Sequence, residues 1–109
     1  MSKPLSFSAF VMNTPSHIVH GLWRDEAGNQ INYNDVELWI KLAQKLEEGG
    51  FDAIFFADVI GLYGNYRGGW EFHAENGLQI PGNDPMVLMS ALAVNTKHLG
   101  LAFTAAPLQ

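Results

Sequence analysis

The hydrophobic pattern of the chain is most distinctive over residues 51–58, where apolar side chains follow one another with only Asp52 interrupting them before Asp58. A strand with one buried face alternates apolar and polar residues, so this run predicts a strand buried on both faces, as in parallel sheets. Chemistry in parallel α/β folds collects at the carboxyl ends of the strands. Asp58 stands at that end and is the first candidate functional residue.

Two further apolar runs predict a strand on either side of this one, over residues 5–12 and 99–103. Each is separated from residues 51–57 by a helical pattern, so the chain is expected to follow the order β-α-β-α-β. Crossovers of this kind place each strand beside the previous one in parallel. The predicted sheet therefore has residues 51–57 at its centre.

Both predicted helices have recognisable beginnings. Over residues 34–48, apolar positions recur at helical spacing, with Asn34 as the expected N-cap and Glu37 placed to complete a capping box. The second helix is expected to begin at Asp84 and Pro85, a strong start signal. Its body is apolar almost all round, which predicts that the helix is buried or covered.

Two long loops, residues 13–33 and 59–83, both follow carboxyl ends of predicted strands. Loops of this length in a compact domain are usually functional or mobile. The second is rich in glycine and aromatic residues, but it has neither GxGxxG nor a P-loop lysine. Its composition favours an aromatic-lined lid over a flat ligand, and an ordinary surface loop is the alternative.

Composition and charge narrow the range of partners. The net charge is −5 with no basic cluster, which argues against nucleic acid and against an anionic membrane surface. The chain has no cysteine, so it has neither disulfides nor a thiolate metal site, and the cytoplasm is the default compartment. Neither a signal peptide nor an apolar run of membrane-spanning length is evident.

The predicted sheet is incomplete as a fold. Three parallel strands leave two open edges, and helices on one side leave the other face bare. A (β/α)₈ barrel takes about 250 residues, whereas this chain has 109. We therefore expect residues 1–109 to be the N-terminal part of a single TIM-barrel domain, with the rest of the barrel supplied by polypeptide outside this chain.

Three motifs keep their order and spacing over nearly the whole chain: His20-Gly21-Leu22-Trp23-Arg24, Phe55-Phe56-Ala57-Asp58 and His98-Leu99-Gly100-Leu101-Ala102-Phe103-Thr104. Together they resemble the flavin-dependent monooxygenases of the bacterial-luciferase-like superfamily. Within it, the chain is similar to the branch that contains nitrilotriacetate monooxygenase and dibenzothiophene-sulfone monooxygenase.

The resemblance implies a TIM barrel, usually a homodimer, that takes reduced FMN from a separate flavin reductase. Reduced flavin and oxygen give a peroxyflavin that oxygenates a small organic substrate, while the protein positions the cofactor and excludes water. It also implies that Asp58 and Thr104 contact FMN. His20 is the catalytic candidate, as a hydrogen-bond donor over the flavin or the substrate.

Each site residue has a structural alternative. Asp58 could cap a turn, and Thr104 could simply suit a strand. Trp23 is interpreted as a packing residue and Arg24 as the partner of Asp25 or Glu26. The remaining histidines are interpreted as ordinary, because their spacing does not match a metal site.

The main alternative to an enzyme is a non-catalytic α/β module that binds a partner chain through its open sheet edges. Such a module has no need for Asp58 and Thr104 on one rim beneath two long loops. A deazaflavin-dependent relative with the same barrel is a second enzymatic alternative.

Overall fold

The computed structural model describes residues 2–17, 19, 21–59 and 61–105. Its sheet has three strands, which lie side by side in the order β1 (Ser8–Met12), β2 (Ala53–Ala57) and β3 (Gly100–Phe103). Both pairs are parallel, with Phe10 opposite Phe55 and Phe55 opposite Ala102. The predicted parallel sheet with a central second strand is confirmed.

The strands begin later than their apolar runs because the chain pairs differently at the amino end of the sheet. The carboxylate of Asp52 accepts a hydrogen bond from the backbone N–H of Phe7 at 2.7 Å. The N–H of Asp52 in turn donates to the carbonyl oxygen of Phe7 at 2.9 Å. These two hydrogen bonds between Phe7 and Asp52, one to a side chain and one to the backbone, come before the regular ladder between β1 and β2.

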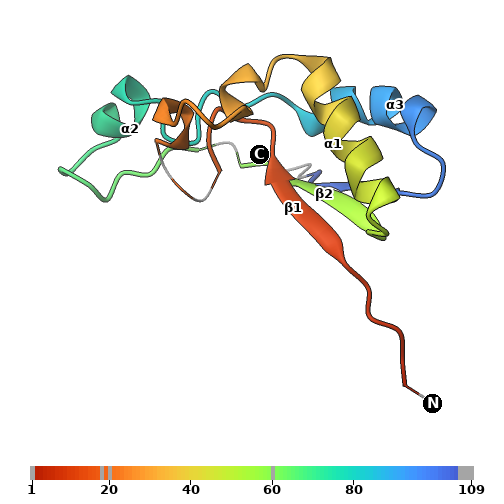
Figure 1. Cartoon of the computed structure of the whole chain (residues 1–109). Helices are drawn as coiled ribbons and strands as arrows, with labels where there is room; N and C mark the ends of the chain where they lie inside the picture. The colour runs from red at the N-terminus through yellow and green to blue at the C-terminus, as the bar shows by residue number, and fades with distance from the viewer. Residues whose placement is uncertain (1, 18, 20, 60, 106–109) are drawn as a thin grey trace.

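Two helices cover one face of this sheet, α1 (Val36–Glu48) and α3 (Pro85–Asn95), as Figure 1 shows. The core lies between them and the strands, and its buried members are Tyr33, Trp39, Ala43, Ile54, Phe56, Leu88, Leu92 and Leu99. Gly50, with a φ of 82°, turns the chain from α1 back toward β2, a conformation that glycine adopts without steric cost.

The start of α1 differs from the expectation by one residue. The N-cap is Asp35, whose carboxylate accepts from the N–H of Glu37 at 3.0 Å. The expected cap, Asn34, instead accepts from the side chain of Asn83 at 2.6 Å. Both residue types are good caps, so a contact with a distant segment decided which of them took the role.

The start of α3 is as predicted, with Asp84 accepting from the N–H of Met86 at 2.9 Å and Pro85 in the first turn. The expectation that this apolar helix is covered is met on one side only, by Pro85, Leu88 and Leu92. Val87 and Val94 are each 81% exposed. In this chain α3 therefore carries an uncovered apolar surface.

Both long loops contain short helices. The first holds the 3₁₀ helices η1 (Leu22–Arg24) and η2 (Gln30–Asn32). The second holds α2 (Glu71–Glu75), which lies at the opposite end of the molecule from α3 (Figure 1). A helix of five residues is too short to produce a readable periodicity, so the pattern indicated only a loop there.

Candidate functional site

The carboxyl ends of the three strands meet at one edge of the sheet, because all three run in the same direction. Asp58 follows β2 directly and is half-buried, and Thr104 follows β3 and is also half-buried. The N–H of Thr104 donates to the carbonyl oxygen of Phe56 at 3.0 Å, so the ladder continues one residue beyond β3. The predicted placement of both residues at one rim is therefore present.

Strand register assigns a face to Thr104. In a parallel ladder, an N–H bonded to Phe56 belongs to the residue opposite Ala57. Ala57 lies on the same face as Phe55, away from α1 and α3, because the intervening residues Ile54 and Phe56 point into the helix-covered core. Asp58 stands outside the strand, so alternation does not fix its direction. That both side chains contact one ligand stays a prediction.

The uncovered face of the sheet is flat and aromatic. Phe10 on β1 and Phe55 on β2 stack with ring centroids 5.5 Å apart and an interplanar angle of 16°. Phe10 is 52% exposed. Beside it, the imidazole of His17 lies 4.8 Å from the Phe10 ring, and burial lowers the pKa of His17 and favours its neutral form.

A run of buried polar residues follows β1 and was not singled out from the sequence. Asn13, Thr14 and Ser16 are each at most 6% exposed. The hydroxyl of Thr14 donates to the carbonyl of Ser16 at 2.6 Å. Their position directly after a strand end, on the same edge as Asp58, was the available signal. They lie at the start of the first long loop.

The predicted catalytic residue His20 lies outside the described residues. Its neighbours in the motif are described: the indole Nε1 of Trp23 donates to the backbone oxygen of Asn76 at 2.9 Å. Arg24 was expected to pair with Asp25 or Glu26, but its guanidinium donates to the side-chain oxygen of Asn76 at 3.0 Å. Asn76 offers a fixed acceptor on the second loop, which the sequence pattern does not reveal.

Aromatic residues of the second loop gather around α2. The rings of Tyr66 and Phe72 meet edge to face at 4.7 Å, and the guanidinium of Arg67 lies 5.3 and 5.2 Å from their respective centroids. Tyr66 remains 50% exposed. This aromatic and glycine-rich segment has the composition of a lid, and its closure over a ligand stays a prediction.

The described part of the chain has neither a metal-binding cluster nor a membrane-spanning helix. Within residues 2–17, 19, 21–59 and 61–105, no three histidine, aspartate or glutamate side chains come together as metal ligands would. In the same residues, every helix is too short or too polar to cross a membrane.

Comparison with known proteins gives no matching family model, but it finds two curated relatives. The chain is 47% identical over 104 residues to the long-chain alkane monooxygenase of Geobacillus thermodenitrificans, and 42% identical over 106 residues to the dimethyl-sulfide monooxygenase of Hyphomicrobium sulfonivorans. These alignments cover 95% and 97% of this chain but 24% and 22% of the relatives. The chain thus spans about a quarter of the length of the curated relatives it matches.

Solved structures agree with this comparison. The crystal structure of long-chain alkane monooxygenase (LadA) matches with a TM-score of 0.90 over 96% of this chain and 24% of that one. DmoA from Hyphomicrobium sulfonivorans matches with a TM-score of 0.89 over 96% of this chain and 22% of that one. A structure of riboflavin lyase (RcaE) with modified FMN and riboflavin matches at 28% identity, with a TM-score of 0.83, covering 95% and 23% of the two chains.

Proposed function

We propose that this chain, a member of the luciferase-like family of flavin monooxygenases, forms three strands of an FMN-dependent monooxygenase barrel. Polypeptide that corresponds to the other three-quarters of its relatives would complete the barrel. In this proposal the complete enzyme is a homodimer, and a separate flavin reductase supplies its reduced FMN. The substrate in this proposal is a small organic molecule, and the names of the alkane and dimethyl-sulfide relatives suggest that it is uncharged.

One observation carries the proposal: the uncovered aromatic face and the polar strand ends occur together. Phe10 and Phe55 present stacked rings on the face to which register assigns Thr104. A flavin ring is flat and apolar on its faces, with hydrogen-bonding groups along its edges. Aromatic faces beside a hydroxyl fit such a group, with the Asp58 carboxylate at the same rim, because pockets for cofactors combine apolar walls with a few placed polar groups.

The residues of this chain would hold and orient the ring. The Asp58 carboxylate can only accept hydrogen bonds, so it suits a ring N–H, whereas the Thr104 hydroxyl can donate or accept. The aromatic face would exclude water from the reaction. Reduced flavin, when bound, supplies the electrons that activate oxygen for transfer to the substrate.

The test is anaerobic titration of the completed barrel with reduced FMN. Completion would be attempted by co-producing the chain with a polypeptide that covers the remaining three-quarters of the alkane monooxygenase relative. Asp58→Ala should weaken FMN binding about 5- to 150-fold, as expected for loss of a hydrogen bond to a buried partner. Thr104→Val should weaken it less, and Glu26→Gln, an exposed control, should leave it unchanged.

Two outcomes would contradict the proposal in different ways. An unchanged dissociation constant for Asp58→Ala would remove Asp58 from the cofactor site and leave it a turn cap. A stable assembly that binds no reduced FMN at all would favour the alternative of a non-catalytic module.

A further inference from the structure

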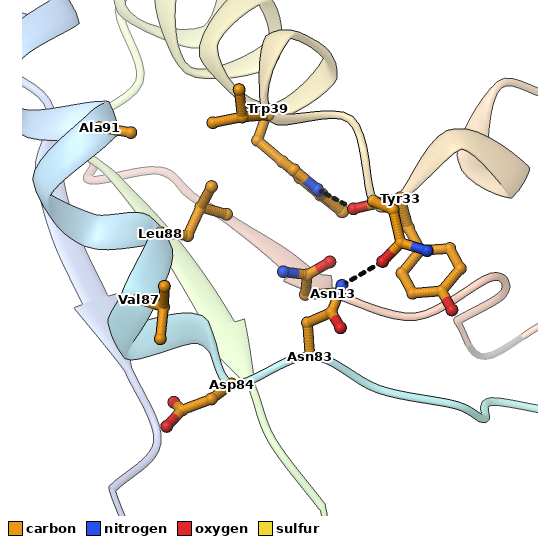
Figure 2. A pocket seen from close by; sticks show the side chains of 10 residues that line it. Asn13, Tyr33, Trp39, Asn83, Asp84, Val87, Leu88 and Ala91 are labelled. Atoms are coloured by element: carbon orange, nitrogen blue, oxygen red, sulfur yellow. Dashed lines mark hydrogen bonds between the residues drawn. The ribbon is translucent and has the colours of Figure 1, made fainter.

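A pocket lies on the opposite side of the sheet from the proposed flavin site, between the N-terminal ends of α1 and α3 (Figure 2). Its volume is about 330 Å³, at the lower end of the range for small-molecule sites. Trp39, Val87 and Leu88 form apolar walls, and Asn13 lies between the two helices at the base. All of its lining residues come from the described part of this chain.

The side chain of Asn13 gives this pocket its chemistry. It is 6% exposed, and its Oδ1 is buried with no hydrogen-bond partner within the described part of the chain. Its backbone oxygen, by contrast, accepts from the N–H of Asn83 at 2.9 Å, which fixes the position of the residue. Buried polar groups in folded proteins are nearly always paired, so the unpaired Oδ1 of Asn13 beside a pocket points to a partner other than the described residues.

Neighbouring polar groups are already engaged with one another. The side chains of Asn34 and Asn83 form an amide–amide hydrogen bond of 2.6 Å. The carboxylate of Asp84 caps α3, and the indole of Trp39 donates to the backbone oxygen of Tyr33 at 2.8 Å. These groups shape the pocket, whereas Oδ1 of Asn13 has no hydrogen-bond partner among the described residues.

We propose that this pocket binds a small neutral carboxamide with a short apolar tail. A primary amide offers one acceptor and two donors, so it can pair with whichever atom of the Asn13 amide faces the pocket. The terminal torsion of asparagine is soft, so a half-turn brings either its oxygen or its nitrogen to the pocket. The tail lies against Trp39 and Leu88.

Charge distinguishes the carboxamide from its closest analogue, a carboxylate. Asp84 lines the pocket, and the chain carries a net charge of −5, so an anion of the same shape is repelled. A tertiary amide lacks N–H donors and leaves Oδ1 of Asn13 unpaired. The site therefore selects for the N–H groups and for neutrality together.

Ligand-observed saturation-transfer NMR on the full chain tests the proposal. The probe is butyramide, and the controls are butyrate and N,N-dimethylbutyramide, which share its tail. Butyramide should bind about tenfold more tightly than either control, the factor expected for one hydrogen bond to a buried group.

Two variants localise the binding. Asn13→Leu should weaken butyramide binding about tenfold, without lowering the melting temperature, because it replaces an unpaired buried polar group with an apolar one. Asn65→Leu, in the exposed second loop, should change neither property. If Asn13→Leu fails to fold, the selectivity of the unmodified chain still decides the question.

Three results would overturn the proposal. One is equal binding of butyramide and its controls, and another is full retention of butyramide affinity in a folded Asn13→Leu variant. The third is no saturation transfer to butyramide at about 10 mM, which would indicate a pocket filled by water alone. None of these results bears on flavin binding, which concerns the other face of the sheet.

Discussion

The indole Nε1 of Trp23 donates a hydrogen bond of 2.9 Å to the backbone oxygen of Asn76, 53 residues further along the chain. Arg24, next to Trp23, binds the side-chain oxygen of the same asparagine at 3.0 Å. The nitrogen of that side chain donates to the carbonyl of Phe72 at 2.8 Å. Through Asn76, the first long loop is tied to the C-terminal end of α2 in the second.

Removing this tie should loosen α2 locally. In Trp23→Phe the ring remains but the donor is lost, so the amides of Ala74 and Asn76 should exchange with solvent about 2- to 12-fold faster, the range expected for one net hydrogen bond. Hydrogen exchange read by mass spectrometry measures this. Amides of α1 around Ala43 serve as the internal control, and equal acceleration there would indicate global destabilisation instead.

The cap of α1 can be tested by substitution. Asp35→Ala should lower the free energy of unfolding by about 1 kcal/mol, because it removes the acceptor for the Glu37 N–H. Glu48→Ala is the control. The ion pair of Glu48 with Lys45 is 3.5 Å long and exposed, so its loss should lower the free energy of unfolding much less than the loss of the cap. Chemical denaturation measures both. A cost for Asp35→Ala no greater than for Glu48→Ala would show that Asp35 is not the effective cap.

Glu47 should make stability depend on acid pH. Its carboxylate accepts hydrogen bonds from the backbone N–H groups of Lys97 and His98 at 2.8 and 2.7 Å. These bonds lower the pKa of Glu47 below its ordinary value, and the bond from Lys97 has the largest effect. A lowered folded-state pKa gives stability that is present above the unfolded value and is lost as the pH falls through the folded one.

Melting temperatures recorded from neutral pH downward test this prediction for Glu47. Glu47→Gln should show a smaller decline below the ordinary glutamate pKa than the unmodified chain, because the variant has no carboxylate to protonate there. Parallel pH profiles for the two proteins would contradict the assigned role.

Two apolar surfaces should make the isolated chain associate. Phe10 is 52% exposed on the open sheet face, and Val87 and Val94 are each 81% exposed on α3. Contiguous apolar patches above a few hundred Å² are rare on monomers. Sedimentation velocity should therefore show oligomers, shifted to smaller species by Phe10→Ser. A monodisperse monomer with a cooperative melt would contradict this expectation.

Local patterns in the sequence determined the frame of the fold. The two-sided apolar run ending at Asp58 predicted a central parallel strand, and Asp84-Pro85 predicted the start of α3. Parallel strands joined by helices must end at one edge, so the common rim of Asp58 and Thr104 also followed from the order of elements. These features depend on near neighbours in the chain, which is why periodicity and capping signals reveal them.

Tertiary structure decided the features that depend on distant partners. Asn34 and Asp35 are equally good caps, and the contact of Asn34 with Asn83 left that role to Asp35. Arg24 binds Asn76 instead of its acidic neighbours, and Oδ1 of Asn13 is buried between α1 and α3 without a hydrogen-bond partner among the described residues. A hydrogen bond across 49 or 52 residues leaves no periodic signal, because its partners meet only after the helices have packed on the sheet.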